Sequence, residues 1–121
     1  MQVKSIGADM EIAVSDHGTV IVVSVQGELN ALTSPDLAEQ LAQSVRQCGN
    51  LVVDMTHVRY ISSAGLHVLF AAIKACRQRN GDLCLVGLEK NVHRVLEMSG
   101  LLDTTQVFGG IDAAIASFTA R

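Results

Sequence analysis

Two adjacent serines, Ser62 and Ser63, are the residues in this chain best placed for chemistry. They follow a short apolar segment, Leu51–Asp54, and a connector, and they precede a long apolar pattern with helical spacing. We therefore expect both hydroxyls to lie where a helix begins. Free N–H groups and the positive end of the helix dipole favour an anion there, and a phosphoserine carries a charge of about −1.5 to −2. The pair is a candidate phosphorylation site, and it indicates a switch more than a catalyst.

Helix capping explains the same serines structurally, because a serine oxygen that accepts a helix N–H bond contributes about 1 kcal/mol. The residue types alone favour capping and leave phosphorylation as the alternative. Ala64 and Gly65 are small, so we expect a flat surface beside the serines on which a partner can lie close. The positions of the expected helix that point away from its core side form a ridge, made of Ser63, His67, Ala71 and Lys74. A partner on this ridge would meet either a neutral hydroxyl or a dianion, a difference large enough to abolish binding.

Enzymatic motifs are missing from the sequence. It contains no Gly-x-Ser-x-Gly elbow and no glycine-rich phosphate loop, and its histidines share no metal-ligand spacing. Asp54, at the end of an expected parallel strand, is a candidate catalytic carboxylate. We favour a capping role for it, because no base or nucleophile lies nearby in the sequence. We therefore predict no catalytic residue, no metal site and no cofactor.

Composition favours one small intracellular domain. The chain has 121 residues, of which 49% are hydrophobic and 17% charged, so residues 1–121 suffice for a single domain with one core. The net charge of −3 gives no attraction to nucleic acid or anionic lipid. Three widely spaced cysteines are typical of reduced core thiols. There is no signal-peptide pattern and no apolar run of membrane-spanning length, so we predict a cytoplasmic protein without membrane insertion.

Strand-like segments alternate with helix-like segments along the chain. The strands expected from apolar and β-branched residues are Met10–Val14, Val20–Val25, Leu51–Asp54, Leu83–Leu88 and a short one near Gln106–Phe108. Nearly continuous apolar character in most of them is typical of strands buried on both faces of a parallel sheet. A short turn at Asp16–Gly18 joins the first two, so one edge of the sheet should be antiparallel.

Four helices are expected between and after these strands. The first has Ser34 as its N-cap and Pro35 as its first residue, and the second runs from near Ser63 to about Arg79. The expected core stripe of the second helix is Leu66, Leu69, Ile73 and Cys76. A third helix covers about Asn91 to Met98, and a fourth contains Ile111, Ile115 and Phe118. The predicted fold class is α/β, with a mostly parallel or mixed sheet of four to five strands, an antiparallel edge strand and about four helices.

Three segments resemble the STAS domain of bacterial anti-sigma factor antagonists. Val25–Asn30 (VQGELN) is similar to the family's Gly-Glu-(Leu/Ile)-Asp segment after the second strand. Asp54–Leu66 (DMTHVRYISSAGL) resembles its Asp-Leu-Ser-x-Val-x-x-(Ile/Met)-Asp-Ser-(Ser/Thr/Ala)-Gly-Leu signature, and Val92–Leu101 resembles its third-helix segment. The segments occur in the family's order, and the resemblance as a whole covers nearly the whole chain. The resemblance is specific for the domain and less specific for its role, because STAS domains serve several systems.

The resemblance implies a partner-switching cycle. The unphosphorylated protein would bind an anti-sigma factor that is also a histidine-kinase-like serine kinase, and phosphorylation of the motif serine, Ser63, would release it. A separate serine phosphatase would reset the cycle. The family's acid before this serine is Ser62 here, and the acid of its Gly-Glu-Leu-Asp segment is Asn30. Ser62 is therefore an alternate acceptor, and Asn30 joins residues 62–65 and the ridge in the predicted partner-binding set.

Two other functions compete with this hypothesis. A structural STAS subunit, for instance of a transporter-associated cytoplasmic assembly, would use the same helix for a constitutive contact, and Ser63 would then be only a cap. A small hydrolase with Ser62 or Ser63 as nucleophile lacks both the elbow motif and an evident base.

Overall fold

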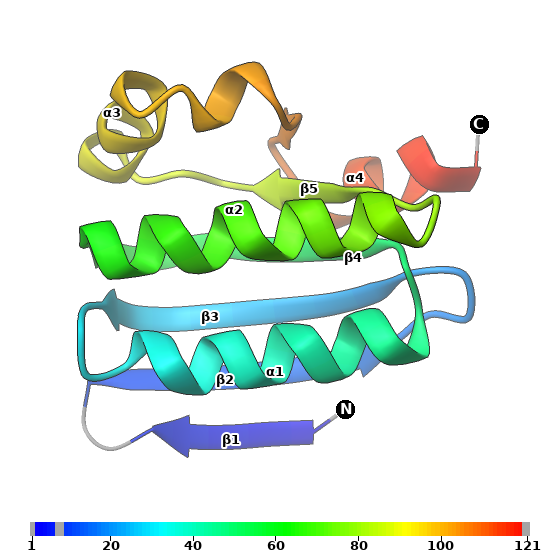
Figure 1. Cartoon of the computed structure of the whole chain (residues 1–121), viewed down its shortest axis with the longest axis horizontal. Helices are drawn as coiled ribbons and strands as arrows, with labels where there is room; N and C mark the ends of the chain where they lie inside the picture. Colours follow the sequence, from blue (N-terminus) through cyan, green and yellow to red (C-terminus); the bar gives the residue numbers. More distant parts are fainter. Residues whose placement is uncertain (1, 7–8, 120–121) are drawn as a thin grey trace.

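A single mixed sheet organises the molecule. The computed structural model describes residues 2–6 and 9–119. Its sheet has six strands in the order β1-β2-β3-β4-β5-β6 (Figure 1). Neighbours pair antiparallel from β1 to β3 and parallel from β3 to β6. The strands are β1 (Gln2–Ile6), β2 (Met10–Asp16), β3 (Ile21–Leu29), β4 (Leu51–Ile61), β5 (Leu83–Val86) and β6 (Val107–Phe108).

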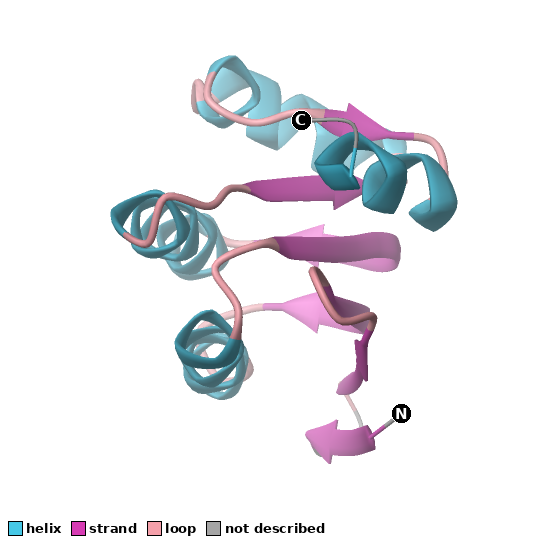
Figure 2. Cartoon of the chain, turned by 90° about the vertical axis from the view of Figure 1, so that its right-hand side faces the viewer, coloured by secondary structure: helices cyan, strands magenta, loops and turns pink. Residues whose placement is uncertain are grey.

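Helices cover the two faces of this sheet unequally. They are α1 (Ser34–Gln47), α2 (Ser63–Gln78), α3 (Lys90–Met98), the 3-10 helix η1 (Leu101–Asp103) and α4 (Ile111–Thr119). Figure 2 shows α1, α2 and α3 on one face and α4 on the other. The main core lies under the first three helices, and a smaller core forms where Ala114 and Phe118 of α4 meet β3, β4 and β5. The predicted α/β class with an antiparallel edge and four helices is confirmed, with one strand more than expected.

β4 is much longer than the sequence indicated. Leu51–Asp54 was expected to be a short strand followed by a connector, and this is wrong because the strand continues to Ile61. Beyond Asp54, β4 pairs with the second half of β3 through two register shifts. These irregularities place the buried residues Met55, Val58 and Ile61 three positions apart instead of two. The alternation that identifies a strand in a sequence is therefore lost here, although the backbone pairing persists.

Other boundaries differ by small, explicable amounts. The N-cap position of α1 is Thr33 rather than Ser34, and the Thr33 side chain caps no helix N–H group. The turn before it is held instead by Asn30 Oδ1, which accepts the N–H bonds of Leu32 and Thr33. β5 ends at Val86, since Gly87 turns the backbone to a φ of +56°. β1 was not predicted at all; it pairs only with β2, at the edge of the sheet.

The predicted course of α2 is confirmed. The helix ends before Asn80, which has a φ of +63°, as expected from Asn80-Gly81. Its buried side includes Leu69, Ile73 and Cys76, as predicted, together with Val68 and Ala72. Leu66 is only partly buried, so the prediction that it belongs to the core stripe is confirmed only in part.

Candidate functional site

Ser62 caps the start of α2. Its backbone is extended, with φ −94° and ψ 176°, and its Oγ accepts a hydrogen bond from the Gly65 N–H at 3.4 Å. This bond is longer than most N–H···O bonds, so the cap is a weak one. The Ser62 N–H donates to the Leu29 carbonyl at 2.8 Å, which ties the helix start to the end of β3. The capping prediction is confirmed for Ser62.

Ser63 differs from its neighbour in both exposure and bonding. It is the first residue of α2 and is exposed, and among the described residues its hydroxyl has no hydrogen-bond partner. No acidic side chain lies in the first turn of the helix. A phosphate on Ser63 would therefore meet the positive end of the helix dipole and solvent, with no carboxylate from that turn to repel it.

Gly65 does not belong to the exposed surface. The prediction that it keeps a partner-facing surface flat is wrong, because the residue is buried against β3 and β4. A Cβ atom at this position would lie 2.8 Å from Ile61 Cγ1 and 3.0 Å from Leu29 Cβ, closer than carbon atoms pack. Gly65 thus allows α2 to begin directly on the sheet. Ala64, beside it, is half-buried and remains available at the edge of the site.

The predicted ridge is exposed along its whole length: Ser63, His67, Ala71 and Lys74. Lys74 forms no ion pair with any residue in the described part of the chain. His67 and Ala71 also border an apolar groove of about 290 Å³ between α1 and α2, lined mainly by alanines. The helix therefore presents small and polar groups outward near Ser63. A contact of this ridge with a partner stays a prediction.

Asn30 organises the turn between β3 and α1. Its Oδ1 accepts hydrogen bonds from the Leu32 N–H at 2.9 Å and the Thr33 N–H at 3.0 Å, and its own N–H donates to Thr33 Oγ1 at 3.0 Å. An aspartate at this position would offer the same acceptor, so the turn does not depend on the missing charge. The role of Asn30 in partner binding stays a prediction.

Leu32, in this turn, is a residue that the sequence analysis missed. It is 82% exposed, an unusual position for a leucine, and it lies three residues after the Leu29 carbonyl that holds Ser62. The only signal in the sequence was a large apolar residue between a strand and a helix cap.

The other candidate groups have structural roles. Asp54 Oδ1 accepts bonds from the Thr56 N–H at 3.0 Å and from Thr56 Oγ1 at 2.6 Å, as expected for a carboxylate that caps its own segment. Within residues 2–6 and 9–119, no group of three or more His, Cys, Asp or Glu side chains is arranged to hold a metal ion. Burial, reinforced by the nearby Asp82 carboxylate, raises the pKa of the Cys76 thiol to about 12. This thiol therefore stays protonated and is a poor nucleophile.

Comparison with known proteins identifies the family. The STAS domain model matches residues 11–114, which is most of the chain. The chain belongs to the STAS domain family. Among curated relatives of this STAS protein, an anti-sigma-B factor antagonist of Listeria monocytogenes is 37% identical over 94 residues, which are 77% of this chain and 80% of the relative.

Solved structures agree with this assignment. An anti-sigma factor antagonist from Mycobacterium paratuberculosis has a TM-score of 0.82 and 28% identity, with 94% of this chain and 97% of that chain covered. The antagonist SpoIIAA in its unphosphorylated form has a TM-score of 0.81 at 14% identity, covering 91% and 97%, and therefore supports the fold alone. In the described part of this STAS protein, no helix is long and apolar enough to cross a membrane.

Proposed function

We propose that this protein is an anti-sigma factor antagonist that switches partners through phosphorylation of Ser63. One observation carries the proposal: the exposed Ser63 hydroxyl, without a hydrogen-bond partner, opens a helix in a STAS domain whose relatives are named anti-sigma factor antagonists. The unphosphorylated protein binds an anti-sigma factor that is also a histidine-kinase-like serine kinase. A serine phosphatase restores that form, and the protein itself catalyses nothing. Residues 1–121 act as one domain.

Charge provides the switch in this proposal. Phosphorylation adds about −1.5 to −2 charge at a point where the first turn of α2 carries none. The backbone near Ser63 is fixed by the Ser62–Leu29 hydrogen bond and by the close packing of Gly65, so the phosphate has no need to reshape the helix start. A partner that fits the neutral surface would have to desolvate a dianion, which costs enough to release it. The Bacillus protein SpoIIAA, which shares the fold, has been solved in a phosphorylated form, so this fold can carry a phosphate.

Ser63 is preferred over Ser62 as the acceptor. The Ser62 side chain is half-buried and holds the Gly65 N–H, so its phosphorylation would remove a cap and crowd the start of the helix. Ser63 needs no such rearrangement. Ser62 is the alternate acceptor, which a phosphate on the Ser63→Ala variant would identify.

Binding to the purified serine kinase encoded in the same genome tests the proposal. After incubation with kinase and ATP, intact mass should rise by one phosphate for wild type and for Ser62→Ala, but not for Ser63→Ala. Calorimetric titration should show that Ser63→Ala keeps kinase affinity and Ser63→Asp loses it by about a hundredfold, equivalent to roughly 3 kcal/mol.

Thr19→Asp is the matched control, because it adds the same charge at an exposed position in the β2–β3 turn, at the opposite end of the sheet (Figure 1). It should bind the kinase like wild type. Equal affinity of Ser63→Asp and Ser63→Ala would refute the charge switch and favour a constitutive structural contact.

A further inference from the structure

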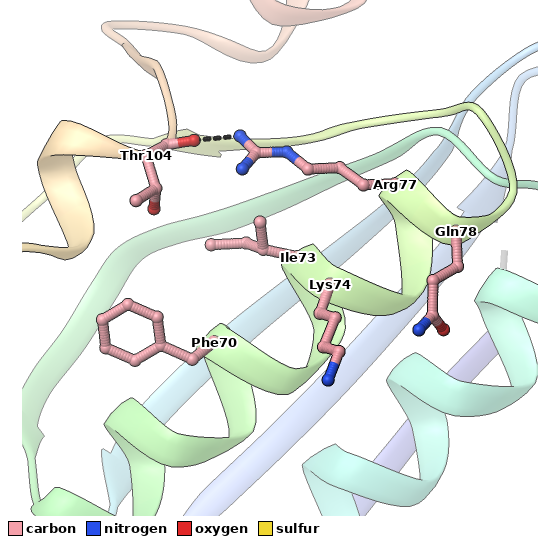
Figure 3. A pocket seen from close by; sticks show the side chains of 6 residues that line it. All are labelled: Phe70, Ile73, Lys74, Arg77, Gln78 and Thr104. Carbon is pink, nitrogen blue, oxygen red and sulfur yellow. Dashed lines mark hydrogen bonds between the residues drawn. The ribbon is translucent and has the colours of Figure 1, made fainter.

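A second hollow lies on α2, away from Ser63. It has a volume of about 550 Å³ and is formed by the second half of α2 and the residue after η1. Its lining residues are Phe70, Ile73, Lys74, Arg77, Gln78 and Thr104 (Figure 3). Lys74 belongs both to this hollow and to the ridge that begins at Ser63, so the two features are continuous. Lys74 lies eleven positions after Ser63, which is about 16 Å along the helix.

The walls of this hollow are held in place. The Arg77 guanidinium donates a hydrogen bond to the Thr104 carbonyl, so α2 is linked directly to the segment after η1 (Figure 3). Thr104 Oγ1 donates to the Leu101 carbonyl at 2.8 Å, and Arg77 Nε lies 3.5 Å from Asp82 Oδ1. The opening therefore exists before any partner arrives, which reduces the entropy cost of binding.

Apolar surface and positive charge meet in the hollow. Ile73 is buried and the Phe70 ring beside it is 38% exposed, so an aromatic face is available to a bulky side chain. Lys74 and Arg77 are the charged residues of the lining, and no carboxylate lines it. Arg77 is paired with Asp82, so Lys74 is the cation of the lining that has no ion pair among the described residues, and its charge opposes the net charge of −3 of the whole chain. Such a site complements an apolar side chain flanked by carboxylates.

We infer that the hollow receives an acidic segment of the anti-sigma factor kinase that carries one large apolar side chain. The inference rests on the proposed function and adds a second contact to it. The apolar side chain packs on Phe70 and Ile73, and the carboxylates approach Lys74 and the outer side of Arg77. Phe70 lies about two helical turns from Ser63, and Lys74 and Arg77 lie about three to four turns away. The contribution of the hollow to affinity therefore does not depend on phosphorylation. The hollow positions the partner on α2, and the phosphate on Ser63 determines whether the partner stays bound.

Affinity measurements on the same kinase separate this inference from the proposed function. Phe70→Ala and Lys74→Glu should each weaken binding by about tenfold or more, as expected for an aromatic anchor and a reversed charge. Phe70→Leu keeps apolar bulk and should retain most of the affinity. Arg46→Glu makes a matched charge reversal at an exposed position near the end of α1 and should bind like wild type. Circular dichroism checks that each variant is folded.

The outcomes are distinct. If Ser63→Asp abolishes binding while Phe70→Ala and Lys74→Glu bind like wild type, the inference is overturned and the switch survives. If Ser63→Asp binds normally, the proposed function fails, whatever the other variants do. If all three weaken binding and the Arg46→Glu control does not, the second contact is established.

A second measurement needs no kinase. The ¹⁵N-labelled protein is titrated with a capped peptide of sequence Glu-Asp-Leu-Phe-Asp-Glu, with the same peptide carrying lysines in place of the acids, and with octanoate. Amide shifts confined to Phe70, Ile73, Lys74 and Thr104, and seen only with the acidic peptide, would support the inference. No shifts at millimolar peptide, equal shifts with the lysine peptide, or shifts with octanoate alone would overturn it.

Discussion

Replacing Gly65 by alanine should destabilise the protein, although alanine is the better helix former. The added Cβ would lie 2.8 Å from Ile61 Cγ1 and 3.0 Å from Leu29 Cβ, whereas carbon atoms at optimal contact are about 3.5–4.0 Å apart. The start of α2 must therefore move by about 0.5–1 Å, or Ile61 must leave its rotamer. Overpacking of this kind costs about 1–3 kcal/mol. The higher helix propensity of alanine returns up to about 1 kcal/mol.

The expected net loss for Gly65→Ala is about 1–2 kcal/mol. The unfolding entropy of a chain of this length is about 0.25 kcal/mol/K, so the melting temperature should fall by about 4–8 °C. Differential scanning calorimetry and urea unfolding measure both quantities. Gly109→Ala is the matched control, because a Cβ at that exposed glycine meets no atom within 4 Å. Its melting temperature should stay the same or rise slightly.

Equal stability of Gly65→Ala and wild type would refute this reasoning. It would mean that α2 is not held against β3 and β4 by close packing. The proposed phosphorylation would then act on a helix start that is free to move. A fall in melting temperature of the same size in Gly109→Ala would show that the effect is not specific to the close approach.

Three further outcomes are expected. Asn30→Ala should lower the free energy of unfolding by about 1–2 kcal/mol, because two turn N–H groups lose their acceptor, whereas Asn30→Asp should retain it; urea unfolding checks both. In the native protein a thiol reagent such as Ellman's should modify the partly exposed Cys48 first and leave the buried Cys76 and Cys84 unmodified until the chain unfolds. Stability should fall as pH rises above the ordinary thiol pKa, because the unfolded chain then loses the Cys76 proton while the native state keeps it up to about pH 12. In that window the slope should be up to about 1.4 kcal/mol per pH unit steeper than in Cys76→Ala.

Local sequence signals accounted for the positions of the serines and for the course of α2. Hydroxyls followed by a helical apolar pattern predict a helix start, and Asn80-Gly81 predicts its end; both depend on residues close together in the chain. The burial of Gly65 could not be predicted in this way. Gly65 packs against Ile61 and against Leu29 of β3, which is distant in the chain, and no local sequence pattern indicates this approach.

Two features that the sequence did not predict, the second half of β4 and the hollow beside Phe70, both depend on contacts between distant segments. The second half of β4 is stabilised by pairing with β3 across two irregularities, so its buried residues follow no regular strand period. The hollow beside Phe70 exists because Arg77 reaches Thr104, a contact between distant segments. The spacing of apolar residues within a short stretch of sequence predicts neither the strand pairing nor the contact between Arg77 and Thr104. The sheet class and the order of the helices, by contrast, follow from patterns within each segment.

The length of β4 places Ser63, the proposed phosphorylation site, well beyond the end of β5. The pairing of β4 with β5 runs from Leu51 to Asp54 and ends there. The seven residues that follow Asp54 extend β4 by roughly 20 Å before Ser62. Ser63 therefore lies beyond the end of β5, although β3 pairs with β4 as far as Ile61. Because Ser63 is exposed there, its hydroxyl can be reached while the domain stays folded. In the proposed cycle, a kinase and a phosphatase would then act on the same native surface in turn. The switching rate would be set by the concentrations of those two enzymes and would be insensitive to the stability of the domain.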